Sequence, residues 1–347
     1  MKILLIILLA SLQMSTAQGQ GLKHVAIVAS YEQGHICGEP QDIGVIEGLA
    51  HMDWSEMGNL KIHRFYMDSK RKNTSKVAQK AVALEILSVI EKSQIQIVIT
   101  LDDNAFREVG LPLVGKEGIS VVFSGLNGQP ENYNKLVNCI DSRAKPGHNV
   151  TGIYEKLYVV KSLQVMLNSI QGLRGNKVIG ITDYSPTGNA ITRQFELEMA
   201  KESVDVKWEL HRVKNWAEYK ELISKINLDS TVKAIYPVAL SLKVSDEITY
   251  TAPEIFKWTV EHSKKPEMAL NYFFSQIGLF GGAAVDFKSM GFAVGQKAAA
   301  ILNGAVAGEL SIDDAPDYAI VFNHKRAQKL GINIPVALLT AAHKVYK

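Results

Sequence analysis

Short apolar runs alternate with amphipathic segments along most of the chain. Two segments of the first half, residues 41–52 and 76–91, repeat apolar side chains at the spacing of an amphipathic helix. Around them lie near-continuous apolar runs or apolar–polar alternations typical of strands, at residues 24–30, 60–67, 95–101 and 119–123. This order predicts a βαβαβαβ unit, which implies parallel strands joined by right-handed crossovers.

The alternation is interrupted near the middle of the chain, at residues 145–157. Pro146 and Gly147 end any regular element, residues 149–153 form a short extended run, and residues 154–171 are amphipathic. The strand and helix patterns then resume, with strands predicted at residues 177–183, 206–212, 232–238 and 267–272. The interruption therefore separates two α/β halves.

A glycine-rich apolar stretch at residues 277–285 indicates a second passage between the halves. We predict two lobes, each a doubly wound parallel sheet, joined by a multi-strand hinge that closes them on a small ligand. Tyr154 and Glu155 directly follow the first interruption, so we expect them beside the cleft between the lobes. The expected boundaries are 18–150 plus 283–347 for the first lobe and 151–282 for the second.

The chain begins with the pattern of a secretory signal peptide. Lys2 supplies a positive charge, residues 3–12 are apolar, and residues 15–17 are small, as before a cleavage site. The apolar run has about ten residues, whereas a membrane-spanning helix needs roughly 20. We expect residues 1–17 to be removed near Ala17 and the mature protein to be a monomer in the periplasm.

Composition and motifs exclude several functions. With 47% hydrophobic and 21% charged residues and a net charge of +3, the chain is globular, and its basic triplet at residues 70–72 does not predict nucleic-acid binding. It lacks the nucleophile-elbow, phosphate-loop and dinucleotide-binding motifs. We therefore expect no enzyme activity, no cofactor and no metal.

Asp102 and Asp103 offer an alternative interpretation, in which they form a general acid–base pair of an enzyme. Adjacent carboxylates that follow a strand, however, more often cap the next helix.

The sequence contains two cysteines, Cys37 and Cys139. An isolated pair in an oxidising compartment favours a disulfide, and both are expected in loops at one edge of a sheet. Closing a loop of about 100 residues would stabilise the fold by up to about 4–5 kcal/mol. The alternative is two unpaired thiols that lie too far apart to bond.

Polar and aromatic residues follow several of the predicted strands. Because ligands of open α/β sheets bind outside the carboxyl ends of the strands, these residues are candidate contacts for a small polar molecule. They are Ser30, Tyr31, Asp103, Asn104 and Ser124 in the first lobe, and Asp183, Tyr184, Asn271 and Tyr272 in the second. Asp183 suits a ligand ammonium or a turn equally, and the tyrosines suit ligand stacking or packing between the lobes.

Two stretches resemble a family of ABC-transporter substrate-binding proteins. Residues 145–152, Lys-Pro-Gly-His-Asn-Val-Thr-Gly, are similar to the RPGGNVTG crossing of that family. Residues 286–302 and 327–335 resemble its characteristic end, in which a glycine- and alanine-rich helix leads to A-x-x-L-G-I-x-I-P. The likeness extends over essentially the whole mature chain.

The resemblance implies a type I periplasmic-binding-protein fold with the ligand held between the lobes. It adds Tyr154 to the ligand contacts named above. Some members of the family are tied to uptake of tryptophan or tyrosine. This chain departs from the family pattern at residues 33–41, 102–104 and 124–127, all of which are expected to face the pocket. An aromatic amino acid therefore does not transfer directly as the ligand.

We interpret the sequence as an exported solute-binding protein that captures a small molecule, with amino acids among the candidates, and delivers it to the membrane permease of an ABC transporter. Two alternatives stay open at this point. One is a ligand-sensing protein that reports to a membrane sensor kinase or chemoreceptor. The other is an exported hydrolase or isomerase that uses Asp102 and Asp103.

Overall fold

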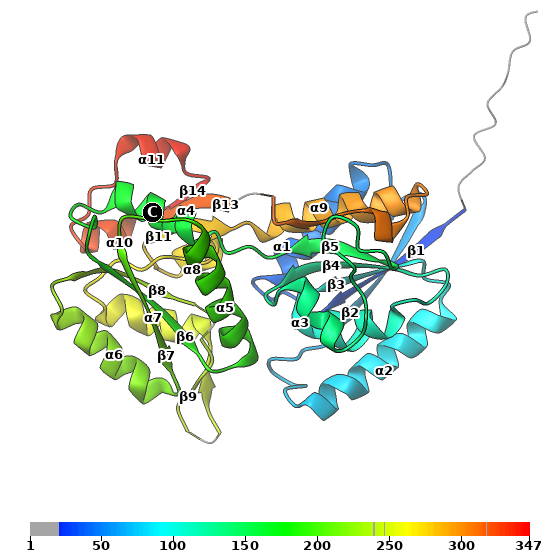
Figure 1. Cartoon of the computed structure of the whole chain (residues 1–347), viewed down its shortest axis with the longest axis horizontal. Coiled ribbons are helices and arrows are strands. Elements are labelled where there is room, and N and C mark those ends of the chain that lie inside the picture. Colours follow the sequence, from blue (N-terminus) through cyan, green and yellow to red (C-terminus); the bar gives the residue numbers. More distant parts are fainter. Residues whose placement is uncertain (1–20, 239, 246, 317) are drawn as a thin grey trace, which may run out of the picture.

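The computed structural model describes residues 21–238, 240–245, 247–316 and 318–347. The expected signal peptide, residues 1–17, lies outside these residues. In the described part of the chain, no helix is both long and apolar enough to cross a membrane. Two α/β lobes lie side by side and are connected along one edge of the molecule (Figure 1).

The first lobe is built on a six-stranded sheet whose neighbouring strands are all parallel. The strand order is β12-β5-β4-β3-β1-β2. The strands are β1 (Lys23–Ala29), β2 (Leu60–Tyr66), β3 (Ile97–Leu101), β4 (Ser120–Leu126), β5 (Val150–Tyr154) and β12 (Ile312–Asp314). β3 and β5 are buried at every position, as the mostly apolar run at residues 95–101 predicts for β3.

Helices cover both faces of this sheet (Figure 1). Alternate residues of β1 point to opposite sides, so Val25 packs with α1 and α9, whereas Ala26 packs with α2 and the turn after β3. The helical elements are α1 (Gly38–Ala50), α2 (Lys76–Lys92), α3 (Asp102–Ala105), η1 (Phe106–Gly110), η2 (Leu111–Leu113), η3 (Pro130–Lys135), α9 (Phe287–Leu302) and η4 (Ala307–Glu309).

Helices α1 and α9 approach each other backbone to backbone. A Cβ atom added at Gly44 of α1 would lie 2.1 Å from the carbonyl oxygen of Lys288, and one added at Gly291 of α9 would lie 2.1 Å from that of Gln41. Gly48 and Gly295 meet the opposite backbone in the same way. The absence of side chains at these positions sets the separation of the two helices.

The second lobe contains two three-stranded sheets and a two-stranded one, β10-β9. Strands β7-β6-β8 are parallel, whereas β11 and β13 of the sheet β11-β13-β14 are antiparallel, and single bridges at residues 267 and 268 connect these two sheets. The strands are β6 (Lys177–Asp183), β7 (Lys207–Val213), β8 (Val232–Pro237), β9 (Leu242–Lys243), β10 (Thr249–Tyr250), β11 (Gly281–Val285), β13 (Tyr318–Asn323) and β14 (Lys344–Tyr346). The helices are α4 (Val159–Ser169), α5 (Pro186–Lys201), α6 (Trp216–Leu228), α7 (Ala252–His262), α8 (Tyr272–Gln276), α10 (His324–Lys329) and α11 (Val336–Ala341).

The lobe boundaries differ from those expected at 18–150 plus 283–347 and at 151–282. Residues 150–154 form β5 within the first sheet, and the final strands β13 and β14 pair with β11 of the second lobe. The chain therefore crosses three times: after β5, after β11 and after β12. The third crossing has no glycine-rich signal, and β12 is only three residues long, so neither stands out in the sequence.

The first and third crossings are bonded to each other. The amide of Ala315 donates to the carbonyl oxygen of Tyr154 at 2.8 Å, and the hydroxyl of Tyr158 donates to the carbonyl oxygen of Ala315. Lys156 and Asp314 add an ion pair at 3.3 Å. The first and third crossings thus form one bonded connection between the lobes, and the second crossing leads directly into α9.

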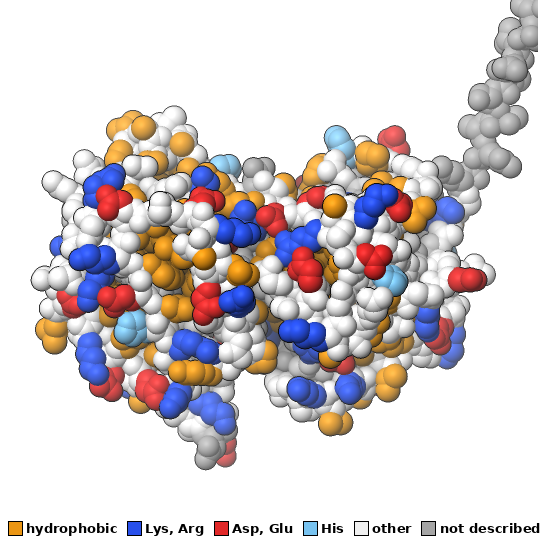
Figure 2. Space-filling model, in the orientation of Figure 1, with side chains coloured by type: hydrophobic (Ala, Val, Ile, Leu, Met, Phe, Trp, Pro, Cys, Tyr) orange, Lys and Arg blue, Asp and Glu red, His pale blue; other side chains and the backbone are white. Residues whose placement is uncertain are grey.

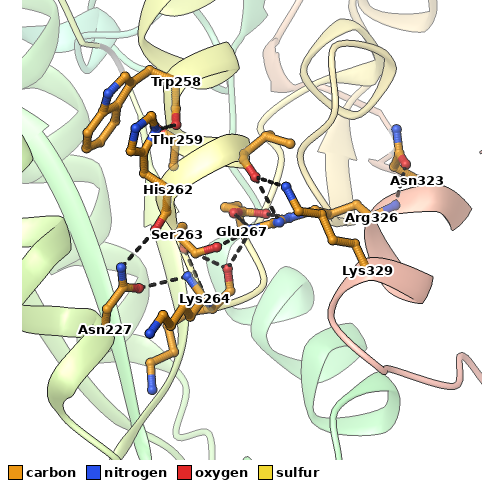
Figure 3. A network of polar contacts seen from close by, with 12 residues as sticks. Asn227, Trp258, Thr259, His262, Ser263, Lys264, Glu267, Asn323, Arg326 and Lys329 are labelled. Atoms are coloured by element: carbon orange, nitrogen blue, oxygen red, sulfur yellow. Dashed lines mark hydrogen bonds and ion pairs between the residues drawn. The ribbon is translucent and has the colours of Figure 1, made fainter.

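A buried ion pair fixes the C-terminal part of the second lobe (Figure 3). Arg326 of α10 donates to Glu267 through Nε at 3.0 Å and also through Nη2, and both residues are almost fully buried. Its guanidinium also donates to the carbonyl oxygens of Val260 and Ser263, each at 2.9 Å. Arg326 therefore ties α10 to the segment between β8 and β11.

Candidate ligand-binding site

Three polar side chains at the carboxyl edge of the first sheet are buried near the boundary between the lobes. Tyr31 follows β1, Asp102 follows β3 and Glu155 follows β5, and their exposed fractions are only 7%, 3% and 2%. Because the strand order is β5-β4-β3-β1, these residues lie along one edge of the sheet. Figure 2 shows the surface hollowed between the two lobes along its lower edge.

Glu155 is the unusual member of this group. Its backbone is held from both lobes, because its amide donates to Leu126 at 3.3 Å and its carbonyl oxygen accepts from Gln194 of α5 at 3.0 Å. Its carboxylate has neither a hydrogen bond nor an ion pair with any described residue. Burial raises the pKa of Glu155 well above its ordinary value, and the nearby charges of Asp102 and Asp103 raise it further.

Asp102 is held by a short chain of side chains. Gln41 of α1 donates to the Asp102 carboxylate at 3.5 Å, and its amide oxygen accepts from the Ser124 hydroxyl at 2.7 Å. The backbone of Asp102 has φ = 67°, the left-handed conformation that non-glycine residues seldom adopt. Burial raises the pKa of Asp102 from 3.8 to about 7, Lys70 opposes this shift, and Asp103 adds to it.

The buried Tyr31 ring packs against Lys70 and His35. The ammonium of Lys70, an exposed residue, lies 4.0 Å from the centroid of the Tyr31 ring, and the His35 ring lies 4.2 Å from it. Burial lowers the pKa of His35 to about 3, with Lys70 and Arg71 contributing, so His35 is neutral at physiological pH. Lys70 is therefore the cation beside this group.

Residues of the second lobe complete the site. The amide of Asn271 donates to the Cys37 sulfur at 3.9 Å, which brings the second lobe into contact with the start of α1. The hydroxyl of Tyr236, on β8, is fully buried and has no hydrogen-bond partner in the part of the chain that is described. Burial, followed by the charges of Glu198 and Glu155, raises the pKa of Tyr236.

The sequence matches the family described as ABC transporter substrate binding protein over residues 37–346. The chain belongs to this family. No curated protein matches it at a significant level. The family prediction made from residues 145–152 and from the C-terminal motifs is thereby confirmed.

Solved structures resemble this substrate-binding protein along nearly its whole length. An ABC domain from Streptococcus pneumoniae in complex with L-Trp is 19% identical, with a TM-score of 0.68, and the match covers 94% of this chain and 100% of that one. A ligand-free, open substrate binding protein with adhesive properties from Clostridium difficile is 15% identical, with a TM-score of 0.70 and the same coverages. A Vibrio cholerae conserved domain protein is 17% identical, with a TM-score of 0.69, covering 93% of this chain and 99% of that one. These similarities confirm the predicted fold of periplasmic binding proteins.

The expected first-lobe contacts of this substrate-binding protein lie in different settings. The Ser30 hydroxyl bonds within the protein, to Leu101 and to Ala105. Asp103 accepts from Asn127 at 3.0 Å and from Tyr133 at 2.6 Å, so its carboxylate orders the loop after β4. The remaining polar candidates also bond within the first lobe: Asn104 to Ser69 and Arg107, and Ser124 to Gln41. Tyr31 is the expected first-lobe contact that lies directly in the buried group.

The other expected contacts are also spread over several places. Asp183 accepts from Ser185 and Ser241 and so stabilises the start of α5. The Tyr184 side chain is 53% exposed and lies under Arg212, whereas Tyr272 packs against a separate small apolar cluster. The Tyr154 hydroxyl accepts from Gln129. Of this set, Asn271 alone makes a described contact across the lobes, to Cys37.

Sequence reasoning left important residues out of the predicted set. Glu155 was expected beside the cleft but not as a contact, and Asp102 was considered only as part of a catalytic pair. Lys70 is considered only as part of the basic triplet 70–72, Gln41 only as the end of the unusual stretch 33–41, and Tyr236 is not singled out. The rule that ligands bind outside the carboxyl ends of the strands would have selected Glu155 and Lys70 if it had also been applied to the residues that follow β5 and β2.

The expected disulfide between Cys37 and Cys139 is wrong. Both cysteines are free. Cys37 packs with the core on the α1 side of the first sheet, whereas Cys139 belongs to the core on the opposite face. The sheet therefore separates the two thiols, and Cys139 instead donates to Asn134 at 3.3 Å.

A separate cavity of about 180 Å³ lies at the side of the first lobe. It is lined by parts of β1, β2 and α1 and by the loop between β1 and α1, and two of its charged residues, Arg64 and Asp42, pair with each other at 3.2 Å. Arg64 also pairs with Glu56 at 3.2 Å. Because this cavity touches only the first lobe, closure of the lobes would not enclose it.

We expect the ligand-free protein to become more stable as the pH falls from 8 to 5. Since burial raises the pKa of Asp102 to about 7, the folded state holds a proton that the unfolded chain releases near pH 4. Between these values the folded state binds more protons, so the free energy of unfolding falls as the pH rises. Each pKa unit corresponds to about 1.4 kcal/mol, so Asp102 can change the free energy of unfolding by at most about 4 kcal/mol over this pH range.

Thermal unfolding at pH 5 and pH 8 measures this effect. The stability of the Asp102→Asn variant should depend much less on pH than that of the wild type. Some pH dependence should remain in this variant, because the pKa of Glu155 is shifted in the same direction. Glu117→Gln, at an exposed position of the first lobe, is the matched control. An equal pH dependence in wild type and Asp102→Asn would contradict the prediction.

Proposed function

We propose that this protein captures a small amine-containing molecule, such as an amino acid, between its lobes and delivers it to the permease of an ABC transporter. The observation that carries the proposal is the carboxylate of Glu155, which is buried at the lobe boundary without a partner among the described residues. Burial raises the pKa of this carboxyl group and so favours its protonated form in the empty site, and a ligand ammonium would stabilise the charged form by pairing with it. Closure of the lobes would surround a ligand at this position.

The hinge supports a closing motion. The first and third crossings are connected through Tyr154, Tyr158 and Ala315, so the lobes would rotate about one bonded segment. The contact between Cys37 and Asn271 would break when the lobes open. A ligand that binds both lobes would shift the population toward the closed state, and the permease would recognise that state.

Hydrogen bonding favours binding over catalysis. Both oxygens of Asp103 accept hydrogen bonds within the protein, from Asn127 and from Gly128 and Tyr133. Asp103 is therefore not available as a general acid or base beside Asp102. We propose no catalytic residue, and we propose export to the periplasm through the signal pattern in residues 1–17.

Thermal unfolding in the presence of metabolites tests the proposal. Amino acids, amines, sugars and nucleosides would be added singly, and a ligand at 100 times its Kd should stabilise the protein by about 2.7 kcal/mol. Mass spectrometry of small molecules released from the purified protein provides a second measurement. The absence of any stabilising compound and of any released molecule would count against the proposal.

Genetic context separates transport from sensing. A permease and an ATPase encoded beside this chain would support delivery to a transporter. A sensor kinase in their place would support the sensing alternative, because the same closed lobes serve as the signal in both.

A further inference from the structure

The acidic groups of the proposed binding site outnumber its basic groups. Glu155 and Asp102 are buried carboxylates, and the ammonium of Lys70 is the cation whose charge acts on both of them. Asp103 does not change this comparison, since hydrogen bonds from Asn127 and Tyr133 already satisfy it. His35 does not change it either, because burial lowers its pKa to about 3. Burial also raises the pKa of both acids, which favours their protonated forms in the empty site, and a cationic ligand group would shift each acid to its charged form.

Two further observations point to a ligand at this acidic group. Glu155 as a residue is only 2% exposed, and its carboxylate makes no hydrogen bond or ion pair with another described residue. The Tyr236 hydroxyl, which belongs to the second lobe, is fully buried and also lacks a partner within the described chain. Native proteins leave few buried polar groups unpaired, so a molecule that binds between the lobes would complete both.

The positions of the charges match one ligand chemistry. Lys70 is exposed and its ammonium lies over the Tyr31 ring, whereas Glu155 and Asp102 are buried. A molecule with one carboxylate and two cationic groups would place its carboxylate at Lys70 and its cations at the two acids. A neutral amino acid supplies only one cation and leaves a second buried carboxylate uncompensated.

We infer that the ligand is a basic amino acid, such as lysine, ornithine or arginine, whose two cationic groups pair with Glu155 and Asp102 and whose carboxylate faces Lys70. This inference rests on the proposed function and narrows it. It differs from the aromatic amino acid bound by the Streptococcus pneumoniae relative. A diamine has the two cations but no carboxylate, so Lys70 would repel it.

Isothermal titration calorimetry at pH 7.5 with lysine, ornithine, arginine, norleucine, cadaverine and tryptophan tests the inference. Lysine and norleucine have side chains of similar length but differ in the terminal ammonium, cadaverine lacks the carboxylate, and tryptophan represents the aromatic alternative. We expect lysine, or its homologue ornithine, to bind at least 100-fold more tightly than norleucine and tryptophan and more tightly than cadaverine.

Variants assign the roles of the three charged residues. Glu155→Gln and Asp102→Asn should each weaken lysine binding by about 30-fold or more, and Glu117→Gln should leave it unchanged. Lys70→Met should weaken lysine binding but strengthen cadaverine binding, which a general loss of folding would not do. Unfolding temperatures near that of the wild type would establish that each variant is folded.

The outcomes separate the inference from the proposed function. Equal or tighter binding of norleucine or tryptophan would overturn the basic-ligand inference and leave a substrate-binding function intact. Tighter binding of cadaverine than of lysine would overturn the role given to Lys70. Failure of every basic amino acid overturns the inference, and failure of the whole metabolite panel overturns both.

Discussion

Replacing Arg326 with methionine is expected to lower the free energy of unfolding by about 3–5 kcal/mol. The change would leave Glu267 as an uncompensated carboxylate in the interior of the second lobe, where burial already raises its pKa. It would also remove the donors to the carbonyl oxygens of Val260 and Ser263. Equilibrium unfolding in urea measures the loss.

Two variants show whether the buried charge is the cause. Lys329→Met removes another cation from α10, but Lys329 is exposed and donates only to Val260, so we expect a change below about 0.5 kcal/mol. The double variant Glu267→Gln/Arg326→Met removes the isolated charge and should recover much of the stability. A loss below about 1 kcal/mol in Arg326→Met alone would contradict the prediction.

Adding one methyl group at Gly44 is expected to destabilise the first lobe by about 3 kcal/mol, at the upper end of the usual cost of overpacking. The new Cβ would lie 2.1 Å from the Lys288 oxygen and 2.8 Å from the Phe292 nitrogen. Both are backbone atoms of α9, so no side chain can rotate away and the two helices must separate. Because alanine favours helix more than glycine does, propensity alone predicts the opposite sign.

Gly38 provides the matched control in the same helix. A Cβ there has its nearest neighbour, the His35 Cβ, at 3.8 Å, which is an ordinary van der Waals contact. Gly38→Ala should therefore be neutral or slightly stabilising. Urea unfolding of both variants tests the contrast, and equal stability of Gly44→Ala and Gly38→Ala would refute the packing argument.

The long elements of the fold were predictable because their patterns are long and uniform. The apolar run at 95–101 contains β3 (Ile97–Leu101), and the pattern at 76–91 coincides with α2 apart from one residue. Strands β12 and β14 have three residues each, too few for a periodicity to show. β12 pairs with β5, far earlier in the chain, so the third crossing could not be predicted.

The site was less predictable than the fold. The rule that ligands bind outside the carboxyl ends of the strands selects loops and not individual side chains. Asp102 and Asp103 are neighbours in sequence, yet Asp103 is satisfied by Asn127 and Tyr133, whereas Asp102 is buried near Glu155. Only the positive φ of Asp102 and the bonds made by the loop after β4 separate their roles. Tyr184 and Tyr272 follow the same rule but lie in other surroundings.

The triple crossing also constrains the order in which the protein can fold. The first sheet receives its edge strand β12 and its covering helix α9 from residues 287–314, after the chain has already passed through most of the second lobe. During synthesis, the edge of β5 that pairs with β12 and the side of α1 that carries Gly44 and Gly48 stay uncovered until residues 287–314 leave the ribosome. Contacts between distant segments form slowly, so the nascent first lobe stays incomplete for most of translation. An exported chain would benefit from this delay, because translocation as an extended polypeptide must precede folding.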